Sequence, residues 1–271
     1  MPEQPERPID GVVARMGERL TQLEREGSTA RHFLATYRRV TVAVGEAAAR
    51  GAVEDPMWLG RWDVAFAELY LQALDTWRAD PAAVPGPWRE AFTAPADLEP
   101  YLHVLLGMNA HINYDMPQSL LQVVTEADRH DATLMGSRER DHHALDGVIV
   151  ALVPQESRHL VRAAAAASGV LDRLLLPMSR AASARLLRES REQVWANTHV
   201  LLRARAVGAG RLDAATSRLE GLATQRVHDL LVPRHPLYHL ARRGFGVRLG
   251  DGDDGGDMND GGDGEARERV G

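Results

Sequence analysis

LLGMNAHINYDMP, residues 105–117, is the stretch of the sequence that most constrains the fold. Four polar residues occupy alternate positions in it, with apolar residues between them: Asn109, His111, Asn113 and Asp115. On a helix, Asn109 and Asn113 share one face, and the other two share nearly the opposite face. A helix with apolar residues and polar pairs on two sides is typical of a protein interior, where each buried polar group needs a partner. The stretch therefore predicts an interior helix.

Helical signals continue on both sides of this stretch. Apolar residues recur at helical spacing, and Asp55 followed by Pro56 is a typical helix start. No convincing run with the two-residue period of a strand stands out. The sequence therefore predicts an all-α fold, a single bundle-like domain of about nine to ten helices. The expected helices span residues 12–27, 28–51, 56–77, a short helix ending near 93, 97–114, a segment from 117, and then 137–153, 155–167, 170–176, 182–205 and 211–231.

Composition sets the domain boundaries. We predict a disordered N-terminus over residues 1–8, the helical domain over 9–245, and a disordered acidic tail over 250–271, because the Gly- and Asp-rich tail cannot bury enough apolar surface to fold. Residues 251–271 contain eight acidic residues and two arginines, a formal charge of −6 that equals the charge of the whole chain. The body is therefore neutral, which argues against nucleic-acid binding because that needs a basic face.

Two absences exclude whole classes of chemistry. The chain has no cysteine, which excludes disulfides, thiolate catalysis, iron–sulfur clusters and cysteine-based zinc sites. All 32 basic residues are arginine, which excludes attachment of pyridoxal phosphate and a P-loop lysine. No stretch of about 18 apolar residues predicts a membrane span, and the polar start of the chain does not look like a signal peptide. We therefore expect a cytoplasmic protein.

His111 and Asp115 are the strongest candidates for chemistry. At i and i+4 on one helix face they can form an oriented imidazole–carboxylate pair, suited to general acid–base work or to metal binding. A structural alternative stands beside this. Asp115 can cap a helix that begins near Pro117, with Gln118 as its capping-box partner, and His111 can be a satisfied core histidine.

Further polar residues lie in two later helices. Asp141, His142 and Asp146 lie close together in one of them, and Arg191 and Trp195 lie in the other. Trp195 alternatively belongs to the core, and charges on a long helix are usually solvated. The pocket hypothesis assigns catalysis to His111, Asp115 and Asp141, and ligand binding to Tyr70, Asn109, Asn113, Asp146, Arg191 and Trp195.

A divalent metal is a further option at this site. Without thiolates, any metal must be held by imidazole and carboxylate groups, which suit zinc, manganese or iron. The expected ligands are His111, Asp115, His142 and Asp146.

Four segments resemble a known family. They are FAELYLQAL at residues 66–74, LLGMNAHINYDMP at 105–117, DHHALDGVI at 141–149 and RESREQVWAN at 188–197. In these the chain resembles a family of actinobacterial proteins known as domain-of-unknown-function family 5995. The family pattern has asparagine where this chain has Asp146, which places a charge where the family carries an amide. The resemblance implies an all-helical fold and no established activity.

Two functional hypotheses fit these residues. In the first, the protein is an enzyme or binding protein for a small organic molecule, with His111 as acid/base or metal ligand. In the second, it is a non-catalytic helical scaffold or interaction protein whose polar core residues are structural. The first requires a cavity that touches His111, and the second requires polar groups that satisfy one another without a void. The sequence does not indicate the oligomeric state.

Overall fold

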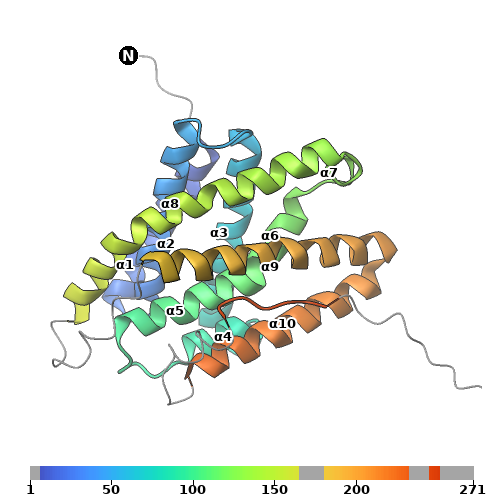
Figure 1. The fold of residues 1–271 in the computed structure, drawn as a ribbon. Helices are drawn as coiled ribbons and strands as arrows, with labels where there is room; N and C mark the ends of the chain where they lie inside the picture. Colours follow the sequence, from blue (N-terminus) through green and yellow to red (C-terminus); the bar gives the residue numbers. More distant parts are fainter. Residues whose placement is uncertain (1–6, 165–179, 232–243, 251–271) are drawn as a thin grey trace, which may run out of the picture.

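The structure is a computed structural model that describes residues 7–164, 180–231 and 244–250. These residues form ten α-helices and one π-helical turn without any β-strand, which confirms the all-α prediction (Figure 1). Residues 251–271 of the predicted tail, residues 1–6 of the predicted N-terminal segment and the helix expected over residues 170–176 lie outside the described residues. In chain order the elements are α1 (Pro8–Arg25), α2 (Ala30–Ala49), α3 (Pro56–Ala79), α4 (Gly86–Phe92), α5 (Pro100–Ala110), the π-turn η1 (His111–Asp115), α6 (Met116–Val123), α7 (Glu126–His130), α8 (Ala132–Ala164), α9 (Arg180–Val207) and α10 (Ala209–Leu231).

The path from α5 through η1 to α6 lies inside the bundle. α3 packs against α1, α2 and α6, while α8 and α9 pack against each other (Figure 1). α10 lies between α9 and α4 and also contacts α5. Because η1 contacts α3, α9 and α10 at once, its side chains are enclosed from several directions.

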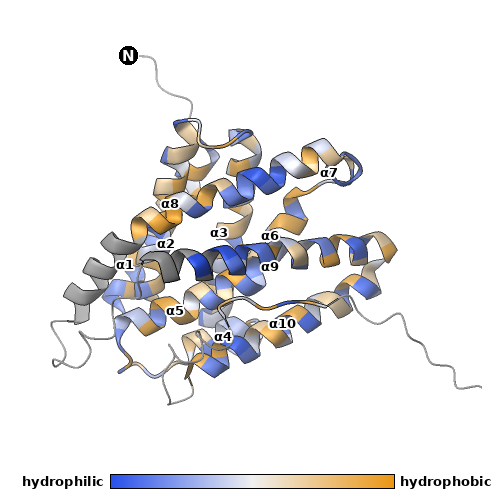
Figure 2. Ribbon diagram, in the orientation of Figure 1, coloured by the Kyte–Doolittle hydropathy of each residue, from blue (hydrophilic) through white to orange (hydrophobic). Residues whose placement is uncertain are grey.

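The amphipathic pattern of the sequence explains how the helices pack. In α1, Val12, Met16 and Leu23 are buried at the helical spacing that predicted this helix. Figure 2 shows hydrophilic residues in the middle of α8 and along much of α9, and hydrophobic residues toward the ends of the coloured part of α8. The largest buried aromatic side chains, Trp58 and Trp88, come from α3 and α4 and lie in the main hydrophobic core.

The helix boundaries confirm one prediction made from the sequence and contradict another. Asp55 caps α3 as expected, since its Oδ1 accepts a 2.9 Å hydrogen bond from the Trp58 N–H. The predicted break at Pro154 is wrong, because α8 continues through it to Ala164. A proline inside a helix removes one backbone hydrogen bond but does not oblige the helix to end.

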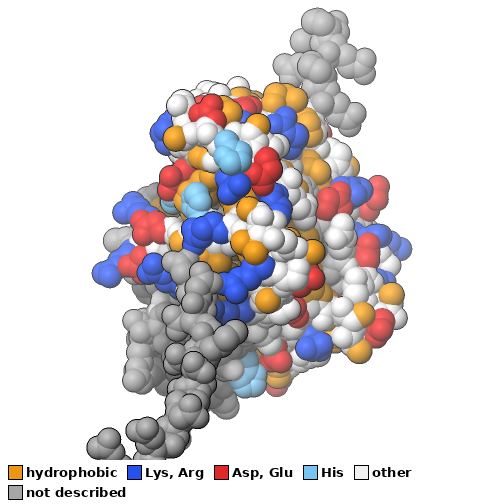
Figure 3. All heavy atoms as spheres, turned by 90° about the vertical axis from the view of Figure 1, so that its right-hand side faces the viewer, with side chains coloured by type: hydrophobic (Ala, Val, Ile, Leu, Met, Phe, Trp, Pro, Cys, Tyr) orange, Lys and Arg blue, Asp and Glu red, His pale blue; other side chains and the backbone are white. Residues whose placement is uncertain are grey.

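The outer surface mixes charges of both signs. Figure 3 shows acidic and basic side chains interspersed on one face of the molecule. Among the described helices, none combines the length and apolar character of a membrane span. Near the C-terminus, Val247 and Leu249 are buried, so the packed part of the chain extends a few residues past the predicted boundary at 245.

Candidate functional site

The centre of the site is the turn η1, where α5 passes into α6 without a break. The Met116 N–H donates to the His111 carbonyl five residues back, the π-helical pattern that is frequent at functional sites. Asp115 has helical φ and ψ of −76° and −38°, and its side chain makes no capping hydrogen bond. The capping alternative for Asp115 is therefore wrong. Gln118, its expected partner, donates instead to the Tyr114 carbonyl.

His111 and Asp115 form a buried pair on one side of this turn. His111 Nδ1 lies 2.8 Å from Asp115 Oδ2, and the same oxygen accepts a 2.9 Å hydrogen bond from Trp88 Nε1. His111 is 3% exposed and Asp115 is 2% exposed. Because the carboxylate holds Nδ1 and fixes the ring, Nε2 is the nitrogen left for chemistry.

Aromatic rings enclose the imidazole of His111. Phe66 stacks on it with ring centroids 3.6 Å apart and an interplanar angle of 8°, and Tyr37 meets it edge-on at 4.4 Å. Three further rings have centroids within 6.1 Å of it: Phe33, Tyr70 and Trp88. We call these five rings and the His111–Asp115 pair the His111 cluster.

Gly107, one turn before His111, makes room for this cluster. A Cβ atom at Gly107 would lie 2.5 Å from Cγ and 2.9 Å from Cβ of Phe33, which is closer than non-bonded carbon atoms approach in proteins. The glycine therefore lets α2 bring Phe33 against α5, and this contact fixes one wall around the imidazole.

Several buried polar atoms in this region have no hydrogen-bond partner among the described residues. They include His111 Nε2, Tyr70 Oη and Asp63 Oδ2. An unsatisfied buried donor or acceptor costs about 1–3 kcal/mol, so native proteins contain few of them. Groups of such atoms are typical of sites that hold a buried water or a small ligand.

Burial controls the protonation of the cluster. It lowers the pKa of His111 well below 6.5, so the neutral imidazole is favoured at pH 7. It raises the pKa of Asp115 well above 3.8, and the hydrogen bond from Trp88 opposes this rise. Burial also raises the pKa of Asp63, one turn from Phe66, from 3.8 to about 7. The interior thus favours uncharged forms of these groups.

The asparagines of the motif face the other side of the path, as the helical spacing predicts. Asn109 Nδ2 and Asn113 Nδ2 each donate a 3.0 Å hydrogen bond to the Phe245 carbonyl. Asn113 Oδ1 accepts a 3.0 Å hydrogen bond from the Val247 N–H. Both amides, expected to bind a ligand, therefore hold residues 244–250 of the chain itself, which we call the strap.

Asp146, Arg191 and Trp195 meet in a second buried group with His142. Arg191 Nε pairs with Asp146, and Arg191 Nη2 donates to the His142 carbonyl. The His142 ring lies near two indoles, with centroid distances of 5.4 Å to Trp62 and 5.5 Å to Trp195. Burial lowers the pKa of His142 well below 6.5, and neither ring nitrogen has a partner in the described part of the chain.

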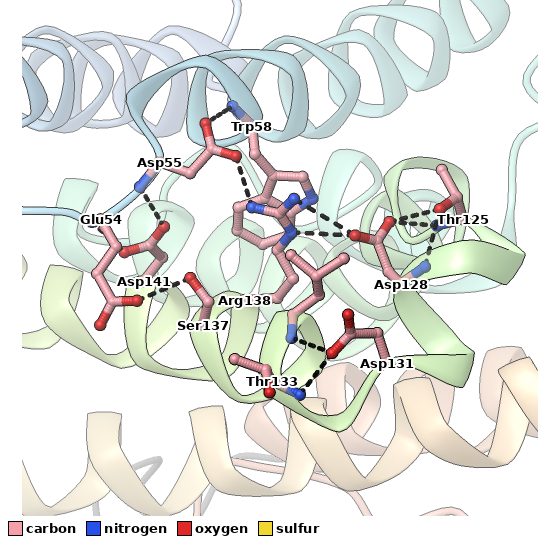
Figure 4. Close-up of polar contacts among 11 residues, drawn as sticks. Glu54, Asp55, Trp58, Thr125, Asp128, Asp131, Thr133, Ser137, Arg138 and Asp141 are labelled. Atoms are coloured by element: carbon pink, nitrogen blue, oxygen red, sulfur yellow. Dashed lines mark hydrogen bonds and ion pairs between the residues drawn. The ribbon is translucent and has the colours of Figure 1, made fainter.

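Asp141 belongs to a network that joins α8 to the start of α3 (Figure 4). Its Oδ1 accepts a 2.6 Å hydrogen bond from the Glu54 N–H, and its Oδ2 a 2.9 Å bond from the Asp55 N–H. Asp55 also accepts a 2.7 Å hydrogen bond from Arg138 Nη1. Both oxygens of Asp141 are thus engaged by the backbone before α3, in a network other than that of His111.

The predicted metal site does not form. Within the described ranges, no group of three or more His, Asp or Glu side chains could hold a metal ion. His111 pairs with Asp115, while Asp146 pairs with Arg191. The ligand set expected from the sequence is therefore wrong: His111, Asp115, His142 and Asp146.

The side chain of His111 is almost fully enclosed and does not open to the surface. A hollow of about 510 Å³ lies between α4 and α10 instead, lined in part by Arg89, Glu220 and His228, and it contains no member of the His111 cluster. Among the described residues, the polar groups of the cluster do not all find hydrogen-bond partners in one another either. The site therefore combines enclosure with unsatisfied polar atoms.

Several residues of these sites are not predicted from the sequence. Asp63 carries a usable signal, because a carboxylate three and seven residues before Phe66 and Tyr70 lies on the apolar face of a helix. Trp88 carries no local signal, since it meets Asp115 across 27 residues. Asn197, which holds the strap, lies in one of the four resembling segments, but its spacing gives no hint of this role.

Comparison with known proteins places the chain in a family without indicating an activity. Searches of the curated proteins and of the solved structures each found no match. A family described as a family of unknown function, DUF5995, matches residues 9–233, which include the His111 cluster and the buried group around Arg191. The chain therefore belongs to the DUF5995 family, as its central motif predicts.

Proposed function

We propose that the protein binds a small, uncharged organic molecule at His111, and that the His111–Asp115 pair exchanges a proton with it. The observation that carries the proposal is His111 Nε2, an enclosed ring nitrogen for which the described residues supply no hydrogen-bond partner. Its ring is held through Nδ1 by a carboxylate, the arrangement in which an imidazole serves as an acid or base through Nε2.

The surroundings select the class of ligand. The cage of aromatic rings favours an apolar body, and burial disfavours a charged one. Tyr70 Oη is a second hydrogen-bonding group without a described partner. A molecule with one hydroxyl or another weakly acidic hydrogen fits this combination. Because His111 is enclosed, the ligand enters only when neighbouring helices move apart, so we expect slow association.

A scaffold or interaction protein is the second candidate function. It is favoured by Asn109 and Asn113, whose amides hold the strap rather than a free ligand. In that case a buried water occupies the position next to His111 Nε2, and the pair fixes the packing of η1.

Nitrogen NMR of the histidine rings, combined with thermal unfolding, tests the first candidate. The probes are phenol, benzyl alcohol and cyclohexanol, which are small neutral molecules with one hydroxyl each. We expect at least one of them to raise the melting temperature and to shift the Nε2 resonance of His111. Mass spectrometry of small molecules released from the denatured protein extends the search to ligands acquired during expression.

Two substitutions control the measurement. His111→Phe keeps an aromatic ring against Phe66 and removes Nε2, so it should abolish the effect of the probe. His130→Phe makes the same change at an exposed histidine and should leave the effect intact. If no probe and no released molecule perturbs His111, or if His111→Phe responds like the parent, the proposed function is wrong and the scaffold becomes the better account.

A further inference from the structure

The strap is an extended segment held by side-chain amides in place of a neighbouring strand. Asn113 bonds to the Phe245 carbonyl and the Val247 N–H. Asn197 repeats the arrangement two residues on, with its Nδ2 donating to the Val247 carbonyl at 3.0 Å and its Oδ1 accepting from the Leu249 N–H at 2.8 Å. Each amide thus contacts a carbonyl and the N–H two residues later, which is how one strand of a parallel sheet contacts the next.

The side chains of the strap alternate between the interior and the surface. Phe245, Val247 and Leu249 are buried, whereas Arg248 is exposed. Val247 and Leu249 share a hydrophobic cluster with residues of η1, α9 and α10: Tyr114, Leu201, Leu219 and Ala223. In Figure 1 the strap is the red segment that runs beside α10. The helices therefore form a groove with apolar sites for every second residue of an extended chain.

One position of the strap favours glycine. A Cβ atom at Gly246 would lie 1.9 Å from Oε1 of Gln193 and 3.1 Å from the backbone Cα of Ser190. The side chain of Gln193 could move away, whereas the close backbone of α9 leaves little room for any side chain larger than that of glycine. The groove therefore selects glycine between the first two apolar residues, and it places no such limit on residue 248.

We propose that this groove is a binding site for extended peptides and that the strap is its exchangeable intramolecular ligand. The occupant is a peptide with apolar residues at alternate positions and glycine between the first two, as in the strap sequence GFGVRLG. Hydrogen bonds to the main chain supply affinity and the alternate apolar sites supply specificity, as in peptide recognition at a sheet edge.

Two further observations support a site rather than ordinary chain packing. Asn109 Oδ1 is buried beside the strap without a partner among the described residues, so the groove has a spare hydrogen-bond acceptor. The family match, residues 9–233, contains all three asparagines of the groove and ends before the strap. Because the groove is separate from His111 Nε2, peptide binding here is independent of the proposed function.

Peptide binding to the full-length chain tests the inference. The probe is a fluorescently labelled peptide, GFGVRLG, with blocked ends, and the reporter is its fluorescence anisotropy. Val247→Pro in the protein removes the N–H group that donates a hydrogen bond to Asn113 Oδ1. We expect this substitution to release the strap from the groove. We expect the labelled peptide to bind this variant at least tenfold more tightly than it binds the parent, because the intact strap competes at a high effective concentration.

Matched peptides identify the binding mode. Replacing the glycine that corresponds to Gly246 by leucine should abolish binding, whereas replacing the arginine that corresponds to Arg248 by alanine should change affinity less than twofold. Asn197→Asp, combined with Val247→Pro in the protein, should weaken binding, because it removes the donor to the peptide carbonyl. A folded Val247→Pro variant that does not bind the peptide at millimolar concentration overturns the proposal.

Hydrogen exchange of the parent chain decides the matter if Val247→Pro does not fold. The amides of Val247 and Leu249 report whether the strap leaves the groove. We expect them to exchange through local opening, faster than amides in the middle of α3. An excess of the unlabelled peptide should speed their exchange further, because it occupies the groove each time the strap leaves. If these two amides exchange only when the whole protein unfolds, the strap is a permanent part of the core and the proposal is wrong.

Discussion

At the scale of single residues, the interior contains ionisable groups that packing alone does not explain. Asp63 and His111 are buried, and each has a polar atom without a partner among the described residues. Natural proteins depart from well-satisfied interiors mainly at functional sites, where stability is given up for chemistry. Because these buried groups have atoms without a partner in the described part of the chain, substituting them should change the free energy of unfolding measurably.

Asp63 should make stability depend on pH. Its pKa is about 7 in the folded chain and 3.8 as an ordinary carboxyl, so the folded state holds the proton more tightly. Stability from this group is therefore complete below about pH 4 and is lost as the pH rises through about 7. At pH 8 the loss is about 4 kcal/mol. Denaturant unfolding should show the advantage of Asp63→Asn over the parent growing by about 2–3 kcal/mol between pH 5 and pH 8. A constant difference across this range would contradict the assignment.

Gly107 should tolerate no side chain. Gly107→Ala places a Cβ against the buried ring of Phe33, so we expect a loss of about 1–3 kcal/mol from overpacking. Gly147→Ala on α8 is the matched control, because its Cβ would meet no atom within 4 Å, and it should stabilise the helix by up to about 1 kcal/mol. Denaturant midpoints of the two variants give the comparison. Equal changes in the two midpoints would mean that Phe33 can move to make room for a Cβ atom, so that the packing beside His111 is not rigid.

At the scale of elements, the π-turn decides how the central motif is presented. The sequence predicts a helix that ends near residue 114, because Pro117 disfavours helix at the residue before it. The chain instead remains helical through η1, and Pro117 lies in the first turn of α6, where a proline needs no N–H partner. Helical spacing correctly separates the asparagines from His111 and Asp115. Nothing in the spacing of the residues signals the π-turn itself.

Asp141 should act on the start of α3 rather than on chemistry. Asp141→Ala removes the acceptor of the Glu54 and Asp55 N–H groups, so we expect a loss of about 1–3 kcal/mol. Asp141→Asn keeps one acceptor and should cost less. Unfolding free energies test the order of the two variants. If Asp141→Ala has the same unfolding free energy as the parent but alters binding of a probe at His111, the carboxylate contributes to the site and the interpretation is wrong.

At the scale of the whole molecule, local patterns predict helices but not the contacts between distant ones. The all-α class, the cap at Asp55 and the two faces of the central motif follow from spacing and helix-start chemistry. The bond from Trp88 to Asp115 and the bonds from Asn113 to the strap, 132 and 134 residues away, depend on how helices pack. No single-sequence pattern contains that information. For this reason the predicted pocket combines residues that the fold places in four separate groups: the His111 cluster, the asparagines on the strap, the buried group around Arg191 and the network of Asp141.

Two truncations should separate the contribution of the strap from that of the acidic tail. Removing residues 251–271 takes away a charged, Gly-rich segment, so the melting temperature should change by less than about 3 °C. Removing residues 244–271 also takes away three buried apolar side chains and the five hydrogen bonds of the asparagines, which we expect to cost on the order of 5 kcal/mol and to lower the melting temperature by about 10 °C or more. Thermal unfolding of both chains, each beside the full-length protein, provides the measurement. A large loss from the shorter truncation would mean that the acidic segment packs against the helical body, and equal melting of all three chains would mean that the strap adds nothing to its stability.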